Sequence, residues 1–168
     1  MRFVKRKGWE YVEREGVGGI VAIVGVTGAG EAVLVSQWRE PVESVVVEWP
    51  AGLAGDTEEV RGEGLEEAAA RELFEETGYR AMRMRRLGEG PPSAGISSEV
   101  VTFFLAEGLE RAGEGGGVAG EKIKVHAVPL SGFGEWVAAR EREGWMVDPK
   151  VYAGMYWLER VLEEAEYD

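Results

Sequence analysis

The fold is decided by residues Leu65–Gly78, LEEAAARELFEETG. At about 100° per residue, Leu65, Ala69 and Leu73 fall on one apolar stripe, which predicts a helix that packs against a core. The terminal glycine suits the left-handed position that follows a last helical turn, so we expect the helix to stop there. Glu76 falls within the same apolar sector. The acidic side of this helix therefore does not simply point away from the core.

Three acids, Glu72, Glu75 and Glu76, stand at i, i+3 and i+4 near the end of this helix. Burial removes hydration from a carboxylate, and the negative end of the helix dipole repels it. A structural helix would carry Lys or Arg there, so the arrangement predicts a bound divalent cation such as Mg²⁺ or Mn²⁺. The alternative is a salt-bridged structural helix, which a Glu67–Arg71 pair at i, i+4 would support.

From Glu63 to Gly78 the pattern Glu-x7-Arg-Glu-Leu-x-Glu-Glu-x-Gly resembles the signature of the Nudix hydrolases, which cleave nucleoside diphosphates linked to another moiety. The family places a glycine six residues before the first glutamate, whereas Gly52 precedes Glu63 by eleven. We therefore expect a loop lengthened by five residues and an unchanged helix register. The resemblance implies an α/β (α+β) fold, a Nudix-type α/β/α sandwich with a mixed β-sheet.

The same resemblance implies a site that holds two or more Mg²⁺ or Mn²⁺ ions. Arg71 would orient Glu75 or Glu76, and Glu63 would hold Arg71 in turn. Residues 48–52, Glu-Trp-Pro-Ala-Gly, resemble the turn whose alanine carbonyl binds metal in the family. The implied ligands are the three helix acids and this carbonyl: Glu72, Glu75, Glu76 and Ala51.

Glu121 opens the alternating segment Glu121–Leu130 and matches the glutamate that acts as general base in the family. Such a base takes the proton of an attacking water. Glu99 and Glu114 are the alternative bases. In the alternating segment we expect the side of Ile123, Val125 and Ala127 to be the apolar face, with His126 opposite, in a structural or exposed position.

Two strand ends and the N-terminal segment resemble substrate-binding parts of the ADP-ribose pyrophosphatase subgroup. The Gln-Trp-Arg run ending at Arg39 resembles an element whose arginine contacts substrate, and a guanidinium fork can bond two diphosphate oxygens. A surface arginine paired with a nearby acid is the alternative. Glu99 follows a loop that resembles the Ser-Pro-Gly loop of the subgroup, with Ala94 in place of its proline, and is a candidate contact to ribose or metal.

Trp9 and Tyr11 in the N-terminal segment, residues 1–17, would stack on the nucleobase, in some relatives across a dimer. Packing over the edge of the core is the alternative for either residue. The resemblance also implies a homodimer to which this segment contributes.

Composition narrows the remaining possibilities. A chain of 168 residues is long enough for one well-buried domain, here residues 1–168, and short for two. The net charge of −12 argues against nucleic-acid binding, and there is no cysteine for disulfides or thiolate metal sites. No apolar run is long enough for a membrane span. We therefore expect a cytoplasmic protein without membrane or nucleic-acid partners.

Periodicity predicts further elements around the acidic helix. The glycine-rich stretch Leu109–Gly120 is expected to be flexible, as either a mobile segment beside the site or a plain linker. The predicted strands and helices are as follows: strands at Trp9–Glu13, Gly19–Val26, Ala32–Trp38, Ser44–Trp49, Ala81–Gly88 and Val100–Ala106, and helices at Ser131–Glu143 and Pro149–Ala165.

These residues together predict hydrolysis of the diphosphate linkage of ADP-ribose or a related nucleoside diphosphate sugar. The products would be a nucleoside monophosphate and a sugar phosphate. The alternatives are a pyrophosphohydrolase for GDP-mannose or another nucleotide, and a nucleotide-binding regulator in this fold that has lost catalysis.

Overall fold

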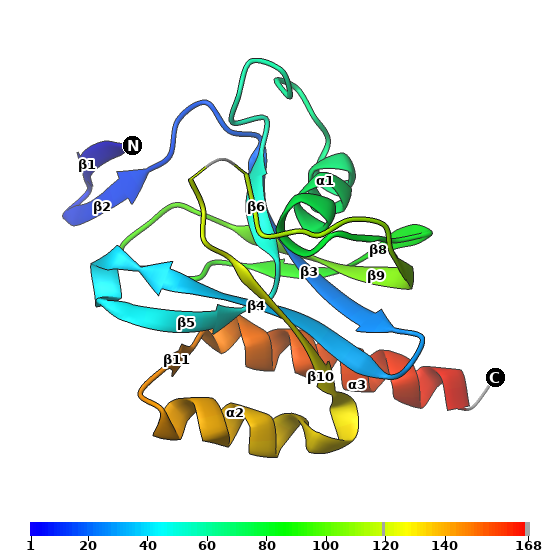
Figure 1. Cartoon of the computed structure of the whole chain (residues 1–168). Helices are drawn as coiled ribbons and strands as arrows, with labels where there is room; N and C mark the ends of the chain where they lie inside the picture. The colour runs from blue at the N-terminus through cyan, green and yellow to red at the C-terminus, as the bar shows by residue number, and fades with distance from the viewer. Residues whose placement is uncertain (119, 167–168) are drawn as a thin grey trace.

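A mixed β-sheet lies between one helix on one side and two helices on the other (Figure 1). The computed structural model describes residues 1–118 and 120–166. Helix α1 (Leu65–Thr77) covers one face, and α2 (Phe133–Arg142) and α3 (Pro149–Glu166) cover the opposite face. The layered α+β architecture predicted from the sequence is confirmed. None of the helices in this part of the chain is long and apolar enough to cross a membrane.

The large sheet has the strand order β11-β5-β4-β3-β9-β7, with β10 beside β4, β6 beside β3 and β8 beside β9. A separate hairpin is formed by β1 (Arg2–Arg6) and β2 (Trp9–Glu13). Short 3₁₀ turns follow β4 and β10 at Glu40–Val42 and Leu130–Gly132. The strands of the large sheet are β3 (Gly19–Thr27), β4 (Glu31–Arg39), β5 (Ser44–Glu48), β6 (Ala51–Ala54), β7 (Tyr79–Arg80), β8 (Arg83–Gly90), β9 (Val101–Arg111), β10 (Lys124–Pro129) and β11 (Met146–Val147).

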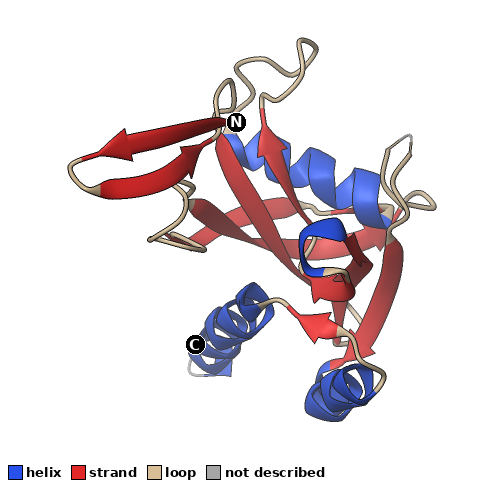
Figure 2. Cartoon of the chain, turned by 90° about the vertical axis from the view of Figure 1, so that its left-hand side faces the viewer, coloured by secondary structure: helices blue, strands red, loops and turns tan. Residues whose placement is uncertain are grey.

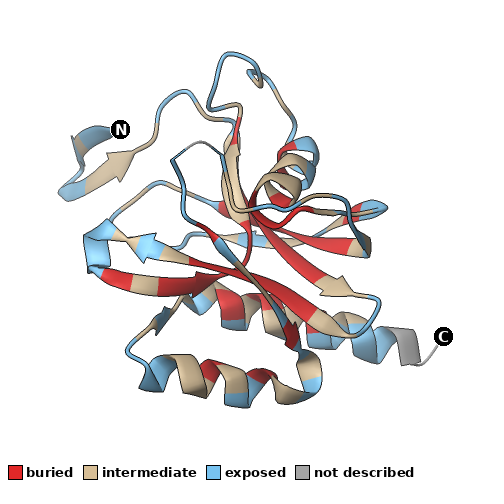
Figure 3. Ribbon diagram, in the orientation of Figure 1, coloured by how far each residue is buried: buried red, intermediate tan, exposed pale blue. Residues whose placement is uncertain are grey.

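Strand β3 is central because helices cover both of its faces. Val21 and Ile23 belong to the apolar cluster under α1, whereas Ala22 and Val24 belong to the larger cluster under α2 and α3. Burial on both faces explains why this stretch is almost continuously apolar rather than alternating. Figure 3 shows the resulting buried band through the middle of the molecule.

The strand that pairs with this edge of β3 changes along its length, so β4 and β6 diverge from one another. Its first residues pair with β6, from Gly19↔Ala54 to Ala22↔Ala51, whereas its far end meets β4 at Val26↔Ala32. The β6 strand was not predicted, because four residues after a proline carry no clear alternation. It matters because it lies directly beneath α1 (Figure 1).

The N-terminal hairpin stands apart from the sandwich (Figure 2). Only its second strand was predicted. The hairpin is attached through Val12, whose N–H donates to the Ile96 carbonyl at 2.8 Å and whose carbonyl accepts from the Ser98 N–H at 3.1 Å. Phe3 and Trp9 on this hairpin are 60% and 62% exposed.

The predicted apolar face of the strand at β10 is wrong. Val128 is fully buried and His126 lies on the same side, while Ala127 is exposed. His126 packs against the rings of Trp136 and Trp145, and its Nε2 is 2.8 Å from the Ser36 hydroxyl. The histidine has a structural position, because α2 covers the face that alternation alone had assigned to solvent.

Helix α3 approaches the sheet closely at Gly154. A Cβ there would overlap the indole of Trp49, a side chain that is 1% exposed and whose Nε1–H donates to the Val151 carbonyl at 3.2 Å. A glycine inside a helix ordinarily costs stability relative to alanine. Its presence here is explained by the room that the indole needs.

We therefore expect Gly154→Ala to destabilise the protein by about 1–3 kcal/mol, because overpacking outweighs the gain in helix propensity. Gly134→Ala in α2 is the matched control, since a Cβ at Gly134 meets nothing within 4 Å. Urea unfolding measures both variants. A Gly154→Ala variant as stable as Gly134→Ala would contradict the packing argument.

Candidate active site

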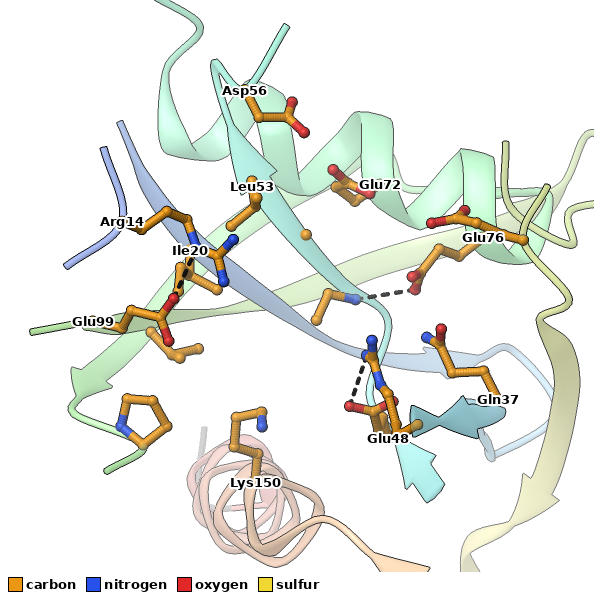
Figure 4. A pocket seen from close by; sticks show the side chains of 16 residues that line it. Arg14, Ile20, Gln37, Glu48, Leu53, Asp56, Glu72, Glu76, Glu99 and Lys150 are labelled. Atoms are coloured by element: carbon orange, nitrogen blue, oxygen red, sulfur yellow. Dashed lines mark hydrogen bonds and ion pairs between the residues drawn. The ribbon is translucent and has the colours of Figure 1, made fainter. Parts of the chain in front are cut away.

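A cavity of about 450 Å³ lies between the second half of α1, strand β6 and the start of α3 (Figure 4). We call it the acid cavity. Its charged lining consists of six carboxylates and three cationic side chains. The carboxylates are Glu48, Asp56, Glu72, Glu76, Glu99 and Glu121, and the cationic side chains are Arg14, Arg39 and Lys150.

Glu72 and Glu76 point from α1 towards the backbone of β6 (Figure 4). Glu76 is 5% exposed, and its Oε2 accepts the N–H of Ala51 at 3.1 Å. The carboxylate of Glu72 lies so close to Gly52 that a Cβ there would overlap it. The predicted placement of Glu76 on the core side of the helix is therefore confirmed. The absence of a side chain at Gly52 leaves room for the carboxylate of Glu72.

Burial raises the pKa of Glu76 to about 8. The N–H of Ala51 partly opposes this shift, while the charges of Glu72, Glu48 and Glu121 add to it. Burial also raises the pKa of Glu72 to about 7, against the opposing effect of Arg71. For both carboxyl groups, the loss of hydration on burial outweighs the interactions that favour the ionised form.

Arg71 is held by Glu63, as the resemblance implied. Its Nε and Nη2 donate to the two carboxylate oxygens of Glu63 at 2.9 and 3.0 Å. Its Nη1 donates to Glu72 at 2.9 Å and to Glu75 at 3.0 Å. Of the two acids that Arg71 was expected to orient, it bonds Glu75, whereas Glu76 accepts the backbone N–H of Ala51 instead.

The Glu67–Arg71 pair of the structural-helix alternative does not form. The carboxylate of Glu67 accepts the N–H of Gly64 and caps the start of α1. Glu75 differs from the other two helix acids, because it does not line the acid cavity. The lengthened loop before Glu63 brings one further carboxylate, Asp56, to the cavity.

The glycine-rich stretch lies beside the site and packs against the end of α1, although its composition predicted a segment too flexible to pack; residues 112–117 make the contacts. We call these residues the glycine strap. Backbone N–H groups of Gly116 and Gly117 donate to the carbonyls of Glu76 and Glu75 at 2.8 and 3.0 Å. These carbonyls belong to the last turn of α1, where carbonyl groups have no hydrogen-bond partners within the helix.

Close backbone approach explains the glycines of the strap. Gly78, with φ +74°, ends α1, and a Cβ there would overlap the carbonyl of Gly113. Gly115, with φ +72°, lies against the backbone of Thr77 in the same way. A side chain at Gly78 or Gly115 would push the strap away from the helix, whereas one at Gly113 would press on the ring of Phe74.

The strap leads directly to Glu121, the predicted general base. Glu121 lines the acid cavity together with Glu72 and Glu76, and its Oε2 accepts the N–H of Val118 at 2.9 Å. Of the alternative bases, Glu99 lines the cavity and Glu114 does not.

Two ion pairs flank the helix acids. Arg39 forms a two-bond pair with Glu48, at 2.8 Å from Nε and 3.0 Å from Nη2. Arg14 donates from its Nε to Glu99 at 2.8 Å. Arg39 therefore lies in the cavity and is also paired with an acid, and its contact with substrate stays a prediction.

Sequence reasoning missed four charged residues of this cavity, Arg14, Glu48, Asp56 and Lys150. Lys150 lies on the side of the cavity opposite Glu72 (Figure 4). Of the four, Glu48 had a signal, since it opens the Glu-Trp-Pro-Ala-Gly turn, and Asp56 lies in the lengthened loop before Glu63. Arg14 and Lys150 reach the cavity from the two ends of the chain, which no local pattern reveals.

Trp9 and Tyr11 are not brought to the acid cavity. They line a separate cavity of about 300 Å³ between the N-terminal hairpin and residues 94–98, which we call the hairpin cavity. It shares no lining residue with the acid cavity. Their contact with substrate stays a prediction.

The donor set fits a divalent cation. Carboxylate oxygens are the ligands that Mg²⁺ and Mn²⁺ prefer. The carboxyl groups of Glu72 and Glu76 are buried with raised pKa values, and Gly52 leaves room beside Glu72. In the part of the chain that the structure describes, no three acids are close enough to hold one ion together. Glu72 and Glu75 share Arg71 as a partner, and Glu76 does not.

Comparison with known proteins agrees with this geometry. A NUDIX domain matches residues 18–146. The chain belongs to the Nudix family. A solved structure of an ADP compounds hydrolase has the same fold, with a TM-score of 0.71 at 20% identity, over 94% of this chain and 78% of that one.

Two relatives extend the comparison to sequence. An ADP-ribose pyrophosphatase of Bacillus subtilis is 42% identical over 91 residues, 54% of this chain and 46% of the relative. A GDP-mannose pyrophosphatase of Salmonella typhimurium is 36% identical over 121 residues, 67% of this chain and 60% of the relative. The Nudix chain thus spans about half to three fifths of the length of these relatives.

We expect Gly115→Ala to destabilise the protein by about 2–4 kcal/mol, because it adds an overlap with Thr77 to the cost of a positive φ. Gly144→Ala is the matched control: its φ is +83° and a Cβ there meets nothing within 4 Å. Urea unfolding compares the two. Equal losses would show that the strap does not depend on close packing.

The raised pKa values predict how stability of the metal-free protein depends on pH. Because the folded state holds protons on Glu72 and Glu76 that the unfolded state releases, stability should fall as the pH rises from about 5 to 8. Glu76→Gln should flatten this dependence. Melting temperatures in EDTA measure it, and identical pH profiles for wild type and variant would contradict the assignment.

Added Mg²⁺ should reverse the loss, since it binds the ionised carboxylates. The rise in melting temperature on adding Mg²⁺ should therefore be larger at pH 8.5 than at pH 6.

Proposed function

We propose that this Nudix protein hydrolyses the diphosphate linkage of ADP-ribose or a related nucleoside diphosphate sugar, with the help of divalent metal ions. The products are a nucleoside monophosphate and a sugar phosphate. The observation that carries the proposal is the meeting of Glu72, Glu76 and Glu121 in one cavity, from segments that lie far apart in the sequence.

Two or more Mg²⁺ or Mn²⁺ ions would be held by the helix acids and a backbone carbonyl, that is, by Glu72, Glu75, Glu76 and Ala51. When bound, the ions supply positive charge to the diphosphate and lower the pKa of the attacking water. Acids dominate the lining of the cavity, and the whole chain carries a charge of −12, so an anionic substrate needs this charge to enter.

The protein's own residues divide the remaining tasks. Glu121 accepts the proton of the water whose oxygen attacks phosphorus, and the bridging oxygen leaves with the departing phosphate. Arg39 is placed to bond the diphosphate from its pair with Glu48, and Arg71 positions Glu72 and Glu75 while Glu63 holds it. Glu99 faces the same cavity and contacts the sugar.

The names of the relatives support the substrate class rather than one member of it. One is an ADP-ribose pyrophosphatase and another is a GDP-mannose pyrophosphatase, so GDP-mannose is the second candidate. The family resemblance leads us to propose a cytoplasmic homodimer, in which Trp9 and Tyr11 of the exposed hairpin contact a partner subunit or its substrate. Sedimentation equilibrium tests the oligomeric state.

Purified protein with Mg²⁺ should convert ADP-ribose to AMP and ribose 5-phosphate, and Glu76→Gln should abolish turnover, since it removes a charged ligand. Product analysis by chromatography across ADP-ribose, GDP-mannose, dinucleoside polyphosphates and nucleoside triphosphates ranks the substrates. Equal and negligible turnover by wild type and variant across this panel would favour a binding protein that has lost catalysis.

Glu121→Gln should lower kcat by about 10²–10⁴ and leave the affinity for Mg²⁺ nearly unchanged, as expected for a lost general base. Glu110→Gln is the matched control, because Glu110 is exposed on β9 outside the acid cavity. A normal rate for Glu121→Gln would transfer the role of base to Glu99.

A further inference from the structure

A second cavity, of about 370 Å³, continues from the acid cavity along the start of α3. We call it the α3 pocket. It shares Pro92, Val101 and Lys150 with the acid cavity, so a molecule bound at the acids can extend into it. The α3 pocket is lined by Gly90, Pro91, Pro92, Val101, Phe103, Asp148, Pro149, Lys150, Ala153 and Trp157.

The walls of the α3 pocket are aromatic and aliphatic. Phe103 is 4% exposed, and its ring centroid lies 4.7 Å from that of Trp157, with the rings tilted by 53°. Gly88 determines where the indole of Trp157 lies, because a Cβ there would come within 2.7 Å of the ring. The aromatic wall is therefore positioned by packing before any ligand binds.

Charge is confined to one edge of the α3 pocket. Asp148 and Lys150 are its charged residues, and their side chains form an ion pair. Asp148 is also fixed at the start of α3, since its Oδ1 accepts the N–H of Lys150 at 2.8 Å. Because Lys150 lines both cavities, its ammonium marks the border between the apolar walls and the acids.

We propose that the α3 pocket binds the nucleobase of the substrate. Lys150 then lies beside the phosphate group of the diphosphate that is attached to the nucleoside. This inference rests on the proposed function. A flat ring can lie against the wall formed by Trp157 and the prolines, whereas the hydroxyls of a sugar would find few partners there. The volume lies within the range of small-molecule sites.

Polar groups elsewhere in the acid cavity suit the sugar half. There the Arg14–Glu99 pair and the nearby Ser97 hydroxyl offer polar groups that can bond hydroxyls. The diphosphate then spans the helix acids, with its base directed towards α3 and its sugar towards Glu99. This orientation differs from one in which Trp9 and Tyr11 hold the base, because the hairpin cavity is not continuous with the acids within one chain.

Equilibrium binding of the two product halves tests the pocket without requiring turnover. We expect the wild-type protein with Mg²⁺ to bind AMP about ten- to a hundred-fold more tightly than ribose 5-phosphate in calorimetric titrations, since only AMP carries a base to stack. Ala153→Phe fills the pocket and should bring the two affinities to within about three-fold of one another. Binding of ribose 5-phosphate should be unchanged.

Ala138→Phe is the matched control. It adds the same phenyl group to a cavity between α2 and α3 that shares no lining residue with the α3 pocket, so the preference for AMP should persist. Circular dichroism checks folding, and Ala153→Leu replaces Ala153→Phe if the larger side chain prevents folding.

Three outcomes would overturn the proposal. They are a wild-type protein without preference for AMP, a preference that survives in the folded Ala153 variant, and a preference that Trp9→Ala removes instead. The last would place the base in the hairpin cavity. If no nucleotide sugar is hydrolysed but Ala153→Phe still abolishes the preference for AMP, the pocket stands and the proposed hydrolysis fails.

Discussion

The last turn of α1 lies directly on the backbone of two other segments, and the site depends on this close approach. Gly52 of β6 leaves room for the Glu72 carboxylate, and Gly78 and Gly115 allow the glycine strap to lie against the end of the helix. Backbone N–H groups of both segments donate to this turn. The N–H of Ala51 donates to the Glu76 carboxylate, and N–H groups of the glycine strap donate to the last carbonyls of α1. These glycines allow close contact between backbone segments.

This approach forces carboxylates into a place where they cost free energy. Burial raises the pKa of Glu76 to about 8 and that of Glu72 to about 7, the latter in spite of its bond to Arg71. Arg71 neutralises the outer acids but does not reach Glu76. A site with buried acids, incomplete neutralisation and an adjoining base candidate is arranged for a cation and an anionic substrate.

Local patterns predicted the elements that local chemistry decides. The acidic helix begins at Leu65 and ends at Gly78, as its apolar stripe and terminal glycine indicated, and β3 is buried on both faces as its apolar run implied. Prediction failed where distant segments decide. The covered face of β10 depends on α2, and the order of the glycine strap depends on carbonyls that α1 presents to it.

By itself, the sequence determined the family and the helix that carries the acids, because the Glu63–Gly78 motif is long and specific and helical spacing fixes where its carboxylates stand. Only the tertiary structure decided which acids share a cavity. It separates Glu75 from Glu72 and Glu76, adds Arg14 and Lys150 from the two ends of the chain, and joins the α3 pocket to the acids. The physical reason is distance along the chain: helical periodicity acts over a few residues, whereas a cavity is formed by side chains that meet only when the layers pack.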